Sequence, residues 1–151
     1  MRLTRFTDNA LRCLIYLGLT ETDPTPASHI AQTMGMSEDH LVKVVQRLAH
    51  LGYVRTLRGR GGGIRLAMQP EAINIGQVVR ATEDNLCIAT CFDKSSHACP
   101  IASACMLAGS LDAALRAFLA ELDKRTLADL LAPRRQLSEL VETSAAMSAT
   151  A

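Results

Sequence analysis

The stretch "SEDHLVKVVQRLAHLGYVRTLRGRGGGIRLA", residues 37–67, contains two different patterns with no linker between them. In its first half, apolar side chains recur on one stripe at helical spacing, and they are Leu41, Val44, Val45, Leu48 and Leu51. The second half alternates, turns at a run of glycines and alternates again, which predicts a β-hairpin. The stretch therefore predicts a helix followed by a hairpin with a basic, glycine-rich tip.

The residues before this stretch predict a second short helix. It is "PASHIAQTMG", residues 26–35, and only "GMS" separates it from the helix that follows. Two helices joined by so short a turn are typical of a helix-turn-helix. Further upstream, Thr7 and Asp8 resemble the cap of a first helix over residues 8–21. Because a hairpin follows the helix-turn-helix, we expect a mainly α-helical, winged-helix protein.

The second half of the chain predicts two more helices with a cysteine-containing loop between them. Residues 73–83 form the first helix, capped by Asn74, and residues 104–125 form a long Ala/Leu helix. Steps of four and three along the long helix predict a seam, made of Ala104, Ala108, Leu111, Leu115, Phe118 and Leu122. The simplest partner for such a seam is a second copy of the chain, so we expect a homodimer.

The predicted organisation has four parts. They are a winged-helix region at 1–83, a cysteine-containing loop at 84–105, a dimerisation helix region at 106–132 and a disordered tail at 133–151. The 151 residues are enough for one domain with a sizeable core. No apolar run is long enough to span a membrane or reads as a signal peptide, so we expect no membrane association and a cytoplasmic location.

The distribution of charge indicates a partner of opposite sign. The net charge is only +1, but residues 1–80 carry +4 and residues 81–151 carry −3. Between residues 43 and 65 there are six basic side chains and no acidic one, which favours double-stranded DNA as the partner. We expect the second helix of the motif to enter the major groove and the wing to reach phosphate or the minor groove. The predicted contacts are Ser37, His40, Lys43, Arg47, Arg58, Arg60 and Gly62.

The chain has five cysteines, which are Cys13, Cys87, Cys91, Cys99 and Cys105. An odd number argues against a framework of disulfides. The last three have seven and five residues between them, and they lack the closely spaced pairs of a zinc ribbon. Since Pro100 follows one of them, the pattern favours an iron–sulfur cluster, with a redox-active disulfide as the alternative. We interpret Cys13 and Cys87 as small core residues.

Several motifs together resemble a known family. The segments "MRLTRFTDNALRCLIYL" and "HLVKVVQRLAHLGYVRTLRGRGGGIRLA" and the three-cysteine loop resemble the iron–sulfur winged-helix repressors that include NsrR, RirA and IscR. The resemblance covers about residues 1–131. The motifs "FTD", "LVKVV", "GGGIRLA", "IGQVVR" and "TLADLL" are most similar to the nitric-oxide-sensing NsrR type. The cysteine spacing does not separate the chain from the iron-responsive RirA type.

The resemblance implies a homodimeric repressor, not an enzyme, that binds a palindromic operator and is released from it by nitric oxide. It implies a [4Fe–4S] cluster, with [2Fe–2S] as the alternative, held by Cys91, Cys99 and Cys105. The fourth ligand would be Asp8 of the partner subunit, from the "FTD" motif. Cys87 is the competing fourth ligand, and further substitutes are Asp93, Glu83 and His97.

Three other functions stay open at this point. The first is an iron-responsive repressor of the same family, and the second is an electron-transfer or redox protein that carries the cluster. The third is a thiol–disulfide sensor that binds DNA without metal. The basic, glycine-tipped wing argues against an electron carrier, which has no use for a DNA-binding surface.

Overall fold

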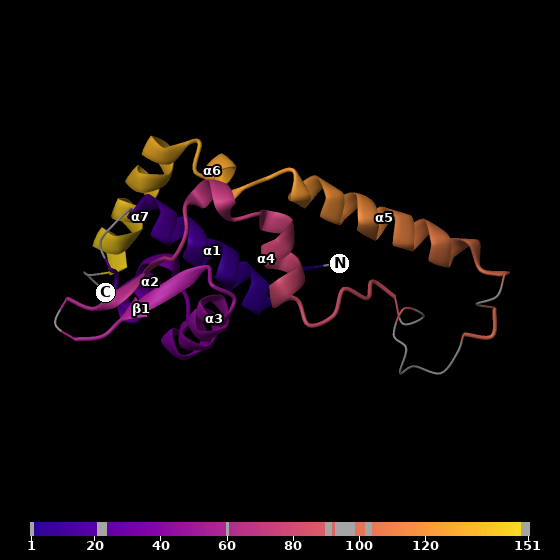
Figure 1. The fold of residues 1–151 in the computed structure, drawn as a ribbon, viewed down its shortest axis with the longest axis horizontal. Helices are drawn as coiled ribbons and strands as arrows, with labels where there is room; N and C mark the ends of the chain where they lie inside the picture. Colours follow the sequence, from indigo (N-terminus) through magenta and orange to yellow (C-terminus); the bar gives the residue numbers. More distant parts are fainter. Residues whose placement is uncertain are drawn as a thin grey trace.

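The computed structural model describes residues 2–20, 24–59, 61–89, 92, 99–101 and 104–148. The elements in order are α1 (Arg5–Leu19), α2 (Ala27–Met34), α3 (Glu38–His50), β1 (Val54–Leu57), β2 (Gly63–Leu66), the short 3₁₀ helix η1 (Pro70–Ala72), α4 (Ile75–Thr82), α5 (Met106–Asp123), α6 (Leu127–Leu130) and α7 (Arg134–Ser148). Helices α1 to α4 gather around the hairpin, and α5 extends away from them (Figure 1). The predicted mainly helical winged-helix fold is confirmed.

The core lies where α1, α3 and α4 meet. Leu14 and Leu17 of α1, Leu41 and Leu48 of α3, and Val78 of α4 are all at most 1% exposed. Burying one such side chain stabilises the fold by about 1.5–3 kcal/mol. The apolar stripe predicted for α3 is therefore confirmed as the buried face of that helix. The exception is Leu51, which is the C-cap residue and is only half-buried.

Helix α1 begins three residues earlier than the sequence predicts. Thr4 is its N-cap, and the Thr4 hydroxyl oxygen accepts a hydrogen bond from the backbone N–H of Thr7 at 3.2 Å. The Thr7 side chain is itself fully buried. The prediction of Thr7 and Asp8 as the cap is wrong, because Asp8 lies inside the first helical turn.

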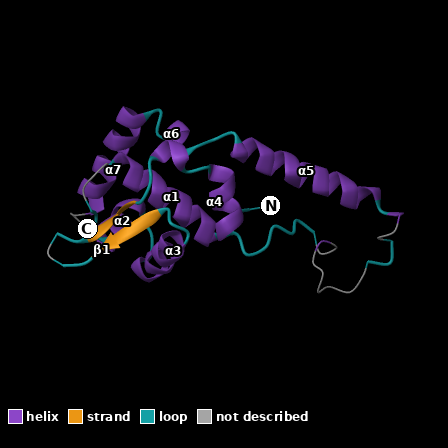
Figure 2. Cartoon of the chain, viewed as in Figure 1, coloured by secondary structure: helices purple, strands orange, loops and turns teal. Residues whose placement is uncertain are grey.

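The wing is an antiparallel hairpin of β1 and β2 in which Val54 pairs with Leu66 (Figure 2). Thr25 pairs with Ile64 on the other edge, through backbone hydrogen bonds of 2.9 and 2.8 Å. The tip turns at Gly59, whose φ of +94° suits glycine. At Gly62, a Cβ atom would overlap the carbonyl oxygen of Leu57. The turn therefore depends on glycine for its backbone path.

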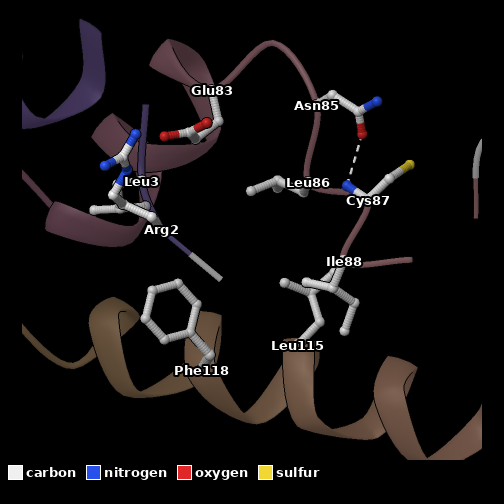
Figure 3. Close-up of a pocket in the computed structure, with 9 residues that line it drawn as sticks. All are labelled: Arg2, Leu3, Glu83, Asn85, Leu86, Cys87, Ile88, Leu115 and Phe118. Carbon is white, nitrogen blue, oxygen red and sulfur yellow. Dashed lines mark hydrogen bonds between the residues drawn. The ribbon is translucent and has the colours of Figure 1, made fainter. Parts of the chain in front are cut away.

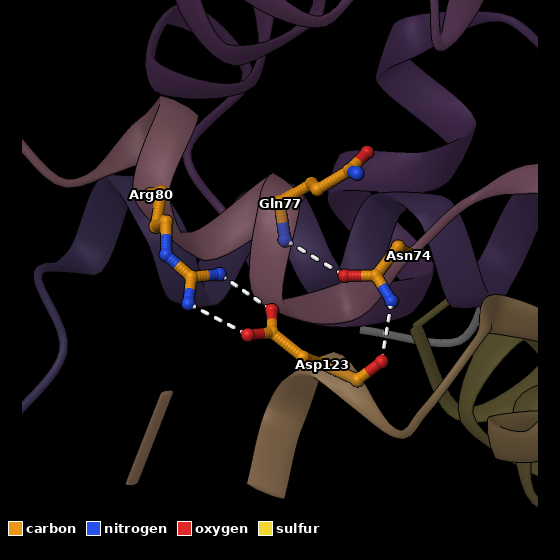
Figure 4. Close-up of polar contacts among 4 residues, drawn as sticks. All are labelled: Asn74, Gln77, Arg80 and Asp123. Carbon is orange, nitrogen blue, oxygen red and sulfur yellow. Dashed lines mark hydrogen bonds and ion pairs between the residues drawn. The ribbon is translucent and has the colours of Figure 1, made fainter. Parts of the chain in front are cut away.

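The end of α5 is joined to α4 by polar contacts (Figure 4). Arg80 donates to both carboxylate oxygens of Asp123 at 2.5 and 2.7 Å, and this pairing lowers the pKa of Asp123. Asn74 caps α4 by accepting from the N–H of Gln77 at 3.0 Å, as predicted, and also donates to the Asp123 backbone carbonyl at 2.7 Å. These contacts fix the direction in which α5 leaves the winged helix.

The C-terminal segment differs from the disordered tail expected at 133–151. Helix α7 occupies most of it and packs against α1 and α2 (Figure 1). Its inward side chains, Leu137 and Val141, are half-buried and four residues apart, so one face of the helix meets the fold. Because most residues after Pro133 are polar or small, the sequence pattern did not indicate this narrow apolar face. None of the helices in the described part of the chain is both long and apolar enough to cross a membrane.

Candidate DNA-binding face and cysteine site

The N-terminal end of α3 presents an exposed polar surface. Ser37 is its N-cap residue, but the hydroxyl makes no capping hydrogen bond within the helix, and Lys43 stands exposed one and a half turns later. Glu38 and Asp39, which the sequence analysis did not single out, occupy the first turn, where carboxylates favour the helix dipole. Carboxylates are also side chains that can accept a hydrogen bond from the amino group of cytosine in a major groove. In the sequence, Glu38 and Asp39 could have been found from their position directly after Ser37, the predicted cap.

The sequence predicted His40 as a DNA contact on this surface, but His40 is less exposed than Ser37 and Lys43. Its side chain is half-buried and its ring meets the ring of Phe6 of α1 edge-on, with centroids 6.2 Å apart. Its Nε2 atom is buried, with no hydrogen-bond partner among the described residues. The tertiary contact with α1 turns this side chain inward, although helical spacing alone places it beside Lys43.

Arg47 is exposed, but its guanidinium is engaged by the fold. Its Nε and Nη2 atoms both donate to the backbone carbonyl of Ala81, at 3.2 and 3.0 Å. Ala81 lies in the last turn of α4. The expected phosphate contact by Arg47 thus competes with a link between α3 and the start of the cysteine loop.

The wing presents Arg58 as an exposed cation at its tip, as predicted. Arg60 lies outside the described residues. Gly62 is half-buried, and the turn geometry explains its presence independently of DNA. Arg55 and Arg65, which the sequence analysis did not list as contacts, stand directly opposite each other across the two strands. Their like charges disfavour the pair, and a nearby anion would offset this cost.

Two of the three clustered cysteines fall within the described residues. Cys99 and Cys105 are half-buried, and Cys105 is the N-cap residue of α5. Cys91, Asp93 and His97 lie outside the described residues. Among those that are described, no three side chains of metal-binding type lie close together. None of the four described cysteines forms a disulfide.

The other two cysteines have opposite environments. Cys13 is fully buried in the core, and burial raises the pKa of its thiol to about 12, so it is not a thiolate ligand. Its assignment as a core residue is confirmed. Cys87 is exposed, and its assignment as a core residue is wrong. Cys87 lines a cavity of about 330 Å³ that lies between α5 and the segment following α4. Leu115 and Phe118 of α5 line the same cavity (Figure 3).

The two acidic candidates also differ. Asp8 is exposed and its carboxylate lies 3.7 Å from Arg12, one turn along α1. It is not a helix cap, and its carboxylate is exposed to solvent. Glu83 accepts hydrogen bonds at one oxygen from the N–H and the hydroxyl of Thr4, at 2.8 and 3.1 Å. Glu83 therefore holds the beginning of α1 against the segment that leads into the cysteine loop.

Helix α5 has few partners within its own chain. Of its residues, all of which the structure describes, Leu119 alone is buried. Leu111, Leu115 and Phe118 of the predicted seam are half-buried, and Leu107 is 64% exposed. The seam is shorter than predicted at both ends, because Ala104 precedes the helix and Leu122 packs against the core of its own chain.

Comparison with known proteins agrees with this architecture. A family model described as Rrf2, iron-dependent transcriptional regulator, matches residues 3–133. The HTH-type transcriptional regulator NsrR of Bacillus subtilis is 48% identical over 143 residues, which cover 94% of this chain and 98% of the relative. The NsrR regulator of Geobacillus kaustophilus is also 48% identical, with 94% and 97% covered.

Solved structures show the same fold. IscR of T. potens has a TM-score of 0.70 at 23% identity, with 87% of this chain and 86% of that chain covered. CymR, the global cysteine regulator of B. subtilis, has a TM-score of 0.66 at 27% identity, with 86% and 95% covered. The named relatives are transcriptional regulators and not enzymes. Together with the winged helix and its basic wing, these matches place the chain in the Rrf2 family of DNA-binding transcriptional repressors.

Proposed function

We propose that this protein is a homodimeric iron–sulfur repressor that binds a two-fold symmetric operator and leaves it in response to nitric oxide. The observation that carries the proposal is the 48% identity, over 94% of the chain, to a regulator named NsrR. The three clustered cysteines before α5 supply the soft thiolate ligands that such a cluster requires.

On the DNA side, we propose that α3 reads bases while the wing contacts phosphate or the minor groove. Ser37 and Lys43 are exposed at the N-terminal half of α3, and Arg58 is exposed at the wing tip. We retain Arg60 and Gly62 as wing contacts, since both belong to the glycine-rich turn of the sequence. His40 and Arg47 act mainly through the fold, because Phe6 and the carbonyl of Ala81 already engage them.

The cluster would be held by Cys91, Cys99 and Cys105, with Asp8 of the partner subunit as the fourth ligand. The donor set fits, since Cys99 and Cys105 form no disulfide and Asp8 is exposed at the start of α1. When bound, the cluster supplies iron that reacts with nitric oxide, most readily where an oxygen ligand replaces a thiolate. These four ligands suit a [4Fe–4S] cluster, and a [2Fe–2S] cluster, which also takes four ligands, is the alternative.

The dimer would form through α5. An extended helix with half-buried Leu111, Leu115 and Phe118 offers a second copy the apolar seam that its own chain leaves uncovered. Because the cysteines directly precede α5 and Asp8 stands on α1, a shared ligand would link the DNA-binding region of one subunit to the dimer helix of the other. The relative placement of the two recognition helices would then depend on that link.

A second candidate is an iron-responsive repressor on the same plan. The description of the matching family as iron-dependent favours it. The two candidates share the DNA-binding face and the cysteine ligands, and they differ in the signal that releases DNA. An electron-transfer role has no similar support, since the named relatives are transcriptional regulators.

Metal analysis of anaerobically purified protein tests the cofactor. We expect about four iron and four sulfide per chain in the parent, in line with a [4Fe–4S] cluster. Single replacement of Cys91, Cys99 or Cys105 by Ala should abolish both iron and brown colour. Cys13→Ala is the matched control and should retain them, because that thiol lies in the core. Colourless parent protein without iron would refute the cluster and favour the thiol–disulfide sensor.

A further inference from the structure

Helix α7 joins the ends of the two helices that support the recognition helix. At its beginning, Arg134 donates to the backbone carbonyls of Gly18 and Leu19, at 3.3 and 2.9 Å. These carbonyls belong to the last turn of α1. Near its other end, the hydroxyl of Ser144 donates to the carbonyl of Thr33 in α2 at 2.7 Å. One helix therefore spans the C-terminal ends of both α1 and α2.

The contact with α2 completes the hydrogen bonding of that helix end. The last four carbonyls of a helix have no partner within it. Those of residues 31 and 32 accept from the backbone N–H groups of Met36 and Gly35, at 2.8 and 3.3 Å, where Gly35 has a φ of +63°. The carbonyl of Met34 accepts from Arg12 of α1. The fourth carbonyl, that of Thr33, depends on Ser144.

This helix end is the start of the turn that leads to the recognition helix. Met34 is the last residue of α2, and Ser37 is already the N-cap of α3. Val141 adds an apolar contact, because it packs against the core, and together with Leu137 and Met34 it lines a groove of about 370 Å³ between α1, α2 and α7. The turn is thus held from its back by both polar and apolar groups of α7.

We propose that α7 is a positioning element of the DNA-binding unit, and that Ser144 is a positioning residue that fixes the end of α2 and hence the direction of α3. Helix α7 begins directly after residues 3–133, the part of the chain that the family model matches. The proposed role therefore concerns a segment outside that match. It does not depend on whether a cluster is bound.

The proposed role should appear as a loss of selectivity between DNA sequences. Base contacts specify sequence and demand accurate placement of α3, whereas phosphate contacts are less sensitive to its orientation. Ser144 is uncharged, so its replacement leaves the electrostatic part of DNA binding unchanged. A variant that loosens the turn should lose affinity for a preferred duplex and keep its affinity for other sequences.

The test compares two hydroxyl deletions in the same turn of α7. Ser144→Ala removes the bond to α2, and Thr143→Ala removes an exposed bond to the Glu139 carbonyl within α7 itself. The probes are a duplex selected by the parent protein from a random pool and a scrambled duplex of the same length. Binding is measured by fluorescence anisotropy at one salt concentration, with circular dichroism and thermal unfolding recorded for each variant.

We expect Ser144→Ala to bind the selected duplex about three- to ten-fold more weakly, the effect of one hydrogen bond, with unchanged binding to the scrambled duplex. Thr143→Ala should match the parent on both duplexes, and Ser144→Thr, which retains the hydroxyl, should restore selectivity. Parent-like binding by Ser144→Ala would overturn the proposal. An equal loss on both duplexes would also overturn it, since that points to general destabilisation.

Discussion

Replacement of Leu115 by Glu should separate the dimer. Leu115 is half-buried within its own chain, so a partner helix covers only the remaining part of the side chain. Full burial of a leucine is worth about 1.5–3 kcal/mol, and at most about a third of that, roughly 0.5–1 kcal/mol, is left for the interface. Two-fold symmetry places two copies at the seam, so the lost burial amounts to about 1–2 kcal/mol per dimer.

That loss corresponds to a dimer dissociation constant about 5- to 30-fold higher, and an unpaired carboxylate in an apolar seam weakens it further. Sedimentation equilibrium over a dilution series measures the constant directly. Ala113→Glu is the matched control, because it adds the same charge at an exposed position on the opposite side of α5. A Leu115→Glu dimer as tight as that of the control would refute the seam, and so would a monomeric parent at micromolar concentration.

Three further predictions follow from other parts of the molecule. Gly62→Ala should weaken operator binding measured by anisotropy and leave the iron content unchanged, since its Cβ would overlap the Leu57 carbonyl and distort the wing; parent-like affinity would contradict this. The thiol of Cys13 has its pKa raised from 9.0 to about 12 by burial, so its stabilising effect is complete below pH 9 and is lost as pH rises towards 12. Thermal unfolding midpoints should fall less steeply over that range in Cys13→Val. Asp8→Ala should keep the iron but change the visible absorption spectrum, whereas an unchanged spectrum combined with loss of iron in Cys87→Ala would make Cys87 the fourth ligand.

The sequence alone predicts those helices, strands and caps whose structure is decided by residues close together in the chain. The buried stripe of Leu41, Val44 and Leu48 follows from helical periodicity alone. The hairpin follows from alternation around glycines, and the Asn74 cap from its place before an apolar helix. In each case, neighbouring residues in the chain carry most of the structural information.

The sequence says less where segments distant in the chain decide the environment of a side chain. His40 and Arg47 share the exposed side of an isolated α3, but Phe6 and the carbonyl of Ala81 engage them in the folded chain. Leu122 has the spacing of the predicted dimer seam, but in the structure it packs against the core of its own chain. Helix α7 went unrecognised because its inward face is narrow and gains its stability from α1 and α2.

The cysteine site was predicted by a mixture of pattern and resemblance. Spacing indicated an iron–sulfur cluster over zinc, whereas the assignment of Asp8 came from the likeness to the NsrR type. Burial confirms that Cys13 is a core residue and separates it from the ligand candidates, as the sequence predicted. The exposure of Cys87 was likewise hidden, because its environment depends on where α5 lies relative to the segment after α4.

The most direct test of the proposed function is an anaerobic titration of the protein–DNA complex with nitric oxide. Operator binding is followed by anisotropy and the cluster by visible absorption in the same sample, and an iron chelator is added to a parallel sample. We predict that DNA is released in step with the change in absorption, at a few nitric oxide molecules per cluster, while the chelator acts slowly or not at all. DNA that stays bound after the absorption change is complete would contradict nitric oxide sensing, and rapid release by the chelator alone would identify an iron-responsive repressor.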